Sequence, residues 1–128
     1  MKKEMKNKGF SLVEVIIVIA IMAVLVGILA PQYLKYVSNS KVSTDITNAQ
    51  EVATVFNVGF ADSIVKASTY TAVPASLTLS NFPTSKYDSS YSWSVEVDDN
   101  GVKEITLGGM KIWPDPKAAG GYYSSLYK

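Results

Sequence analysis

One carboxylate stands inside the most apolar stretch of the chain. Residues 10–30 read FSLVEVIIVIAIMAVLVGILA, and only Ser11 and Glu14 among them are clearly polar. A charge at the centre of a bilayer costs about 2.5–3.5 kcal/mol on insertion scales, and less near the interface, where Glu14 would sit. An ionisable residue in such a segment indicates a function and a partner of opposite charge. The chemistry that Glu14 offers is therefore ion pairing in apolar surroundings.

A new α-amine is the natural partner for this carboxylate. If the chain is cut between Gly9 and Phe10, Phe10 acquires a positively charged terminus four residues before Glu14. A plain membrane anchor has no reason to place a carboxylate within its apolar run. The position of Glu14 therefore favours a processed chain over a simple anchor.

Other chemistry has little support in the composition. The 128 residues include no cysteine and no histidine, so thiolate sites, disulfides and the commonest catalytic bases are absent. No glycine-rich phosphate loop is present, and we expect no cofactor and no enzymatic activity. Asp98 and Asp99 are weak calcium candidates, but acidic residues at a hairpin tip are usually solvated, and their spacing does not match an EF-hand loop. We therefore expect no metal site.

The segment that carries Glu14 has the length of a membrane span. Its 21 residues would extend about 32 Å as a helix, against a bilayer core of roughly 30 Å. Four lysines precede it, which predicts that residues 1–9 stay in the cytoplasm. The net charge of the whole chain is +1, and no basic patch suited to nucleic acid follows the span. A secretory signal peptide fits poorly because the apolar run is longer than the usual 7–15 residues.

The residues around the proposed cut resemble a known family. Lys8-Gly9 followed by FSLVE and about twenty apolar residues is similar to the class III signal of type IV pilins and pseudopilins. The resemblance covers residues 1–31 closely and the following helix loosely. It implies that a prepilin peptidase cleaves after Gly9 and N-methylates Phe10. It also implies that Glu14 contacts the terminal amine of a neighbouring subunit.

The resemblance carries further expectations about partners and location. It implies a helical homo-oligomeric filament, built by an assembly platform and an ATPase from a precursor held in the cytoplasmic membrane. The finished filament would be extracellular and serve adhesion, motility or biofilm formation. A pseudopilin of a type II-like secretion or competence apparatus is one alternative, and a membrane-anchored surface domain that never polymerises is another. The lysine-only basic set and the lack of a disulfide loop are compatible with a Gram-positive pilin.

A helix kink or local melt is predicted at residues 27–31. Pro31 lacks the N–H that would bond the carbonyl of Gly27, and its ring crowds that carbonyl. Gly27 weakens the helix by about a further 1 kcal/mol.

The chain after the span predicts an amphipathic helix half followed by a small sheet. Apolar residues recur in steps of four and three on one helix face, with polar residues such as Asp45 elsewhere: Val42, Ile46, Ala49, Ala53, Phe56 and Phe60. We expect one kinked helix over residues 10–60, a loop over 68–90 with one strand near 77–79, and strands over 93–97, 102–107 and 110–113. Asn100-Gly101 predicts the hairpin turn.

These elements predict an α+β fold, in which a long kinked helix packs on a small antiparallel sheet, the ladle of pilins. The expected parts are a leader at 1–9, a membrane or filament-core helix at 10–30, an amphipathic half at 31–62 and a globular sheet domain at 63–128.

Overall fold

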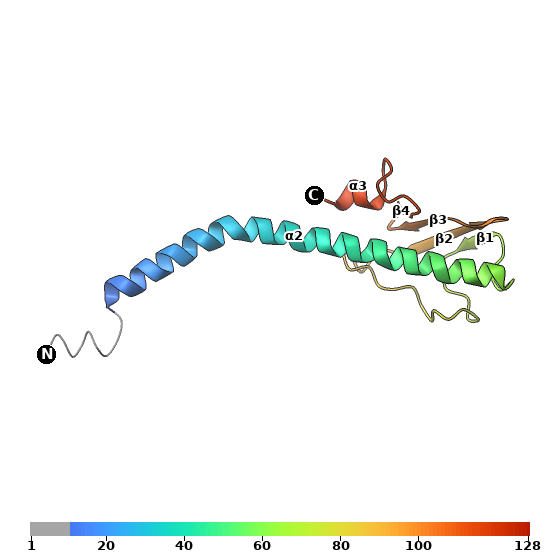
Figure 1. The fold of residues 1–128 in the computed structure, drawn as a ribbon, viewed down its shortest axis with the longest axis horizontal. Helices are drawn as coiled ribbons and strands as arrows, with labels where there is room; N and C mark the ends of the chain where they lie inside the picture. Colours follow the sequence, from blue (N-terminus) through green and yellow to red (C-terminus); the bar gives the residue numbers. More distant parts are fainter. Residues whose placement is uncertain (1–10) are drawn as a thin grey trace. The chain divides into compact units, whose positions relative to one another are not determined.

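The structure is a computed structural model that describes residues 11–128. The described residues divide into two units, the first ending at Tyr36 and the second spanning Val37–Lys128. One α-helix, α2, contributes to both and runs over Leu12–Ala61 (Figure 1). The predicted helix at 10–60 is therefore confirmed within the described residues, and Phe10 lies outside them.

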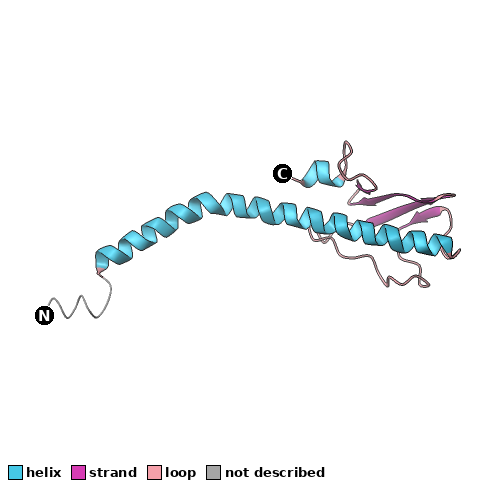
Figure 2. Cartoon of the chain, in the orientation of Figure 1, coloured by secondary structure: helices cyan, strands magenta, loops and turns pink. Residues whose placement is uncertain are grey.

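The second unit contains a four-stranded antiparallel sheet in the order β1-β2-β3-β4. Its strands are β1 (Ser68–Tyr70), β2 (Trp93–Asp98), β3 (Gly101–Leu107) and β4 (Met110–Trp113), and a short helix α3 (Tyr122–Leu126) follows. The strands lie beside the second half of α2 in Figure 1, so this unit has the expected α+β layout of a helix on a small sheet. Figure 2 shows the long connection between β1 and β2 as loop.

The central hairpin follows from alternation and a turn signal. Trp93, Val95 and Val97 of β2 are buried while the residues between them are partly exposed. Asp98 pairs with Gly101 across the turn, so Asp99 and Asn100 form the loop itself. The predicted hairpin and the strand at residues 110–113 are confirmed. The predicted turn pair Asn100-Gly101 is displaced by one residue, because Gly101 pairs with Asp98 and begins β3.

The strand expected near residues 77–79 is not present. Residues 75–76 form a turn, which is closed by the N–H of Leu77 donating to the carbonyl of Pro74 at 3.1 Å, and residues 77–79 continue as irregular chain. The fourth strand is instead β1, and Ser68 pairs with Val97 at the edge of the sheet. Pro74 supplies the physical reason, since proline cannot donate to a sheet ladder and disfavours a strand around it.

The helix ends in a Schellman motif. Ser63 has a positive φ of 63°, and its N–H donates to the carbonyl of Phe60, while the N–H of Ile64 donates to the carbonyl of Gly59. These bonds satisfy carbonyls that the last helical turn would otherwise leave open. They also turn the chain back so that Val65 is buried in the core.

The buried face of α2 is rotated slightly from the predicted one. Val42, Ala49, Ala53 and Phe56 are buried as expected, whereas the predicted Ile46 and Phe60 are only partly buried. The expectation that Asp45 lies on the polar side is wrong, because its exposed fraction is 0%. The full buried set is Val42, Asp45, Ala49, Val52, Ala53, Phe56 and Gly59.

Candidate functional site

The first unit begins with a helix cap that places Glu14. Ser11 precedes the helix, and its Oγ accepts a hydrogen bond from the N–H of Glu14 at 3.2 Å. Serine is a favoured N-cap residue because its hydroxyl satisfies an N–H that has no partner within the helix. Ser11 and Glu14 have the spacing of a capping box, and the carboxylate lies in the first turn, where the helix dipole favours negative charge. The predicted processing residues Gly9 and Phe10 lie outside the described residues.

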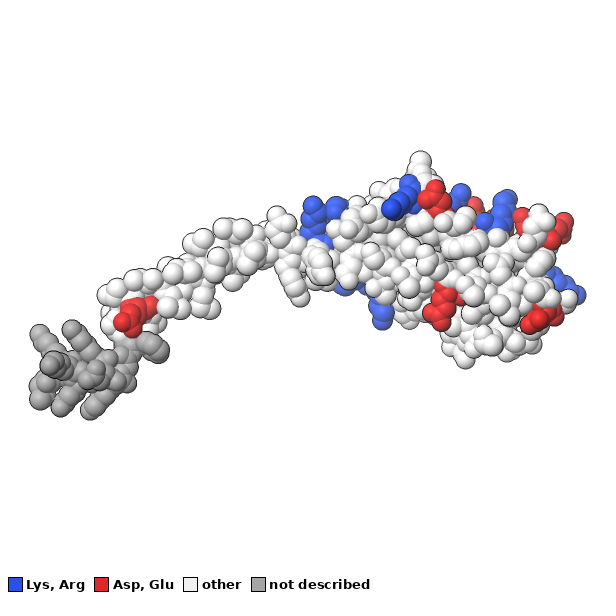
Figure 3. All heavy atoms as spheres, in the orientation of Figure 1, with Lys and Arg blue, Asp and Glu red and all other residues white. Residues whose placement is uncertain are grey.

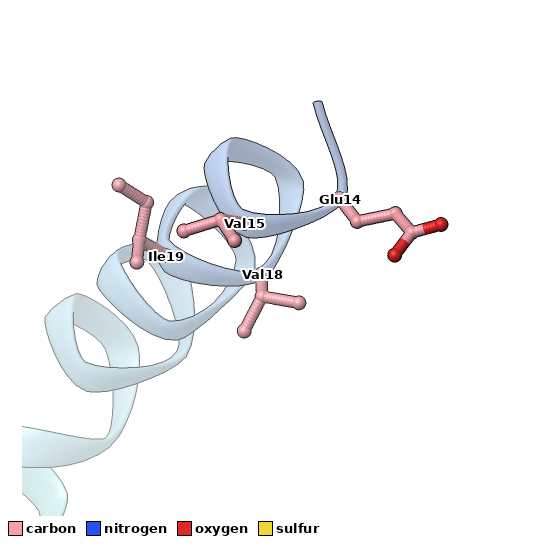
Figure 4. A pocket seen from close by; sticks show the side chains of 4 residues that line it. All are labelled: Glu14, Val15, Val18 and Ile19. Carbon is pink, nitrogen blue, oxygen red and sulfur yellow. The ribbon is translucent and has the colours of Figure 1, made fainter. Parts of the chain in front are cut away.

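The carboxylate of Glu14 points away from its own helix. Figure 4 shows it directed outward, next to a shallow hollow that is lined by Glu14, Val15, Val18 and Ile19. No lysine nitrogen lies within 4 Å of it among residues 11–128, where the two ion pairs join strands of the sheet. The next charged residue along the chain is Lys35. In Figure 3 a long stretch of the molecule next to the grey residues carries a single patch of red atoms and no blue ones.

The surface around Glu14 is apolar on every side of the helix. Each large apolar side chain from Leu12 to Leu34 is exposed, with exposed fractions of 45% or more. The helix is long and apolar enough to cross a membrane. An exposed apolar surface of this extent requires a covering partner, either lipid or other apolar helices.

Gly27 and Pro31 both lie within the continuous helix. No neighbouring atom lies within 4 Å of a Cβ built on Gly27, so no contact within the described chain requires glycine there. Pro31 leaves the carbonyl of Gly27 without its usual donor. The kink at these residues stays a prediction.

A second cluster of polar side chains lies in the core of the second unit, around Asp45. Its Oδ2 accepts hydrogen bonds from Ser85 Oγ at 2.6 Å, from the Tyr87 N–H at 3.2 Å and from the Tyr122 hydroxyl. Its Oδ1 accepts from the Lys86 N–H at 2.7 Å. Four donors therefore converge on one buried carboxylate, which ties the loop at 85–87 and helix α3 to α2.

Tyr122 is held neutral in this cluster. Burial raises the pKa of its hydroxyl well above 10, the hydrogen bond to Asp45 raises it further, and Ser85 opposes these effects. A neutral phenol can donate to a carboxylate, whereas a phenolate beside it would be repelled. Every polar atom of the cluster has a partner, so its role is structural.

Sequence reasoning missed Asp45, Ser85 and Tyr122 as a group. The available signal was the spacing of Asp45, three residues after Val42 and four before Ala49, which puts it on the buried face. Nothing in the sequence pairs it with residues forty and seventy-seven positions later.

The weak metal candidates have a local role. Asp98 Oδ1 accepts the Asn100 N–H at 2.8 Å and so stabilises the hairpin turn. Within the described part of the chain, no group of three or more acidic, histidine or cysteine side chains is placed to hold a metal ion.

Comparison with known proteins bears on the N-terminal segment. Residues 5–30 match the family model described as the prokaryotic N-terminal methylation motif. Two curated relatives, both described as type IV major fimbrial protein FimA of Dichelobacter nodosus, are 36% identical over 56 residues. The match covers 44% of this chain and about a third of each relative's length, 36% and 35%. No solved structure matches significantly.

The matched residues include the predicted cut site between Gly9 and Phe10, Glu14 and most of the apolar stretch. The α+β layout, a long apolar helix with a four-stranded sheet, is the layout expected from the resemblance to pilins. The chain is therefore similar to type IV pilins in its N-terminal methylation motif and in its arrangement of a long apolar helix with a small sheet.

Proposed function

We propose that the chain is a structural, non-enzymatic subunit that polymerises through its apolar helix into a type IV pilus filament. The observation that carries the proposal is the outward carboxylate of Glu14 on a helix whose apolar surface is uncovered. A membrane satisfies the apolar surface but leaves the carboxylate without a cation. A bundle of like helices satisfies both when each helix also brings an amine.

Processing would supply that amine. Prepilin peptidase would cut between Gly9 and Phe10 and methylate Phe10, and methylation keeps the amine cationic. Glu14 of one subunit would then pair with the Phe10 amine of a neighbour. A buried ion pair is a better device for fixing register than for adding stability, because desolvation offsets most of its attraction. The pair would thus set the axial offset between subunits.

The remaining expectations follow from this role. The precursor would be held in the cytoplasmic membrane with residues 1–9 in the cytoplasm. An assembly platform and its ATPase would move it into an extracellular filament that serves adhesion, motility or biofilm formation.

The test uses Glu14→Leu and Glu14→Gln in the full chain, with Glu51→Gln as the matched control at an exposed position of the same helix. We expect both Glu14 variants to be processed and membrane-held. Their yield of sheared filaments should fall about tenfold or more, because leaving one buried ion unpaired costs about 3–5 kcal/mol. Electron microscopy with an antibody against residues 68–128 measures the yield, and mass spectrometry identifies the N-terminus.

Three outcomes would count against the proposal. Wild-type filament yields from Glu14→Leu would refute the pairing role. A wild-type chain that begins at an unprocessed Met1 would favour the surface domain that never polymerises. A processed chain that forms only short fibres within the envelope would favour the pseudopilin alternative.

A further inference from the structure

A short aromatic and cationic segment follows the apolar stretch of α2. Tyr33 and Tyr36 are 66% and 72% exposed, and Leu34 between them is 67% exposed. Lys35 is also exposed and is the first charged residue after Glu14. The proposed filament contact through Glu14 makes no use of these side chains.

Tyr33 continues an apolar face of the helix. It lines one shallow hollow together with Leu25, Val26, Leu29 and Ala30. Side chains on a helix tilt toward its N-terminus, so the ring of Tyr33 leans back over the apolar residues. Tyr36, three residues later, lies on a neighbouring part of the same side. Both tyrosines therefore add a polar hydroxyl to the C-terminal part of an otherwise apolar surface.

The distance between the two charges matches a bilayer. Lys35 lies 21 positions after Glu14, which corresponds to about 32 Å along a helix, and the hydrocarbon core of a bilayer is about 30 Å thick. With Glu14 at one boundary, Lys35 lies at the other. Tyr33 and Tyr36 then fall in or next to the headgroup layer, which is about 5–8 Å thick on each side.

We propose that Tyr33, Lys35 and Tyr36 form an interfacial anchor that binds the glycerophospholipid headgroup layer on the exported side and fixes the depth of α2 before assembly. Tyrosine is enriched at this layer because its ring is apolar and its hydroxyl polar. Lysine places its ammonium among phosphates while its stem stays on apolar surface. The anchor rests on the membrane-held precursor of the proposed function but not on the pairing of Glu14.

Lipid explains this segment better than a second copy of the chain. A contact between like helices at this level would bring lysines of the same charge together and would remove tyrosine hydroxyls from water. The headgroup layer supplies both opposite charge and hydrogen-bond acceptors.

The experiment measures depth with one fluorescent label. Because the chain has no cysteine, Gln32→Cys provides a single site for a bimane probe. The full chain is reconstituted in vesicles of phosphatidylcholine and phosphatidylglycerol that contain quencher lipids at known depths. In the parent chain we expect the probe at the boundary of the hydrocarbon core.

Removing the anchor should move the probe inward. The double change Tyr33→Leu and Tyr36→Leu lengthens the apolar stretch, so the probe should shift by about 3 Å toward the centre, the rise of two helical residues. The double change to tryptophan should keep the parent depth, since tryptophan also prefers the interface. Tyr127→Leu, an exposed tyrosine outside the first unit, is the matched control and should change nothing.

The outcomes separate the two proposals. If the parent chain binds vesicles and the leucine variant keeps its depth, the anchor is refuted and the membrane-held precursor stands. If the parent chain does not enter vesicles, the precursor proposal fails as well. If the leucine variant keeps its depth but loses filaments, the tyrosines contact other subunits and the anchor is wrong.

Discussion

At the scale of single residues, the two carboxylates of α2 differ in what surrounds them. Asp45 is buried and accepts from four donors within its own unit. Glu14 points outward, and no lysine among the described residues is near it. The hydrogen bonds of Asp45 stabilise its own unit, whereas Glu14 has no cationic partner among residues 11–128, which is consistent with the proposed pairing between subunits. Changes at the two positions should therefore affect different measurements.

Asp45→Asn should destabilise the second unit by about 2–3 kcal/mol. The amide would point an NH₂ group at donors that now reach an oxygen, and it would leave a buried donor without a partner. Tyr122→Phe should cost only about 1–1.5 kcal/mol, because one hydrogen bond is lost and the ring remains. Thermal unfolding of the full chain in detergent, followed by near-UV circular dichroism, measures both. The exposed turn variant Asp99→Asn is the control, and an effect at Asp45 no larger than at Asp99 would contradict the structural role.

Tyr122 also predicts a dependence on alkaline pH. Its pKa is raised above 10 in the folded protein by burial and by Asp45. Above pH 10 the unfolded chain loses the phenol proton while the folded chain retains it, so the contribution of Tyr122 to stability is full below pH 10 and declines as pH rises. The stability difference between the parent chain and Tyr122→Phe should therefore shrink between pH 10 and 11.5. A difference that stays constant over that range would show that the hydroxyl is not held neutral.

At the scale of elements, local signals predicted some parts and contacts distant in sequence decided others. The β2–β3 hairpin follows from alternation around Asn100-Gly101, because both signals lie within one short segment. The edge strand β1 depends on pairing with β2 across a long loop, and no local pattern marks it. Helix α3 has only five residues, and its position depends on Tyr122 reaching Asp45. The candidate site at Glu14 could be predicted from the sequence, because the carboxylate and the apolar residues around it are adjacent in the chain.

The predicted weak point at Gly27 and Pro31 belongs to the scale of the helix as a whole. The carbonyl of Gly27 has no helical donor, and proline in a helix interior is less favourable than alanine by about 3 kcal/mol. We predict that, in detergent, amides near residues 27–30 exchange hydrogen at least tenfold faster than those near 18–22. Pro31→Ala should remove the difference, while Ala23→Gly, which weakens the helix elsewhere by about 1 kcal/mol, should not. Equal protection along the parent helix would contradict a weak point there.

At the scale of the whole molecule, the chain separates into a part without an internal core and a part that holds all of it. Among the described residues, every buried hydrophobic side chain belongs to the unit Val37–Lys128, starting with Val42. Residues 11–36 are exposed along their whole length.

A fragment that begins at Val37 should therefore be soluble without detergent and unfold cooperatively, with a midpoint within a few degrees of that of the full chain. A fragment that begins at residue 47 lacks Val42 and Asp45, so it should lose the near-UV signal of the packed core. If the fragment from Val37 also lacks that signal, the apolar half of α2 contributes to folding of the second unit. The inference that residues 11–36 add nothing to its stability would then be wrong.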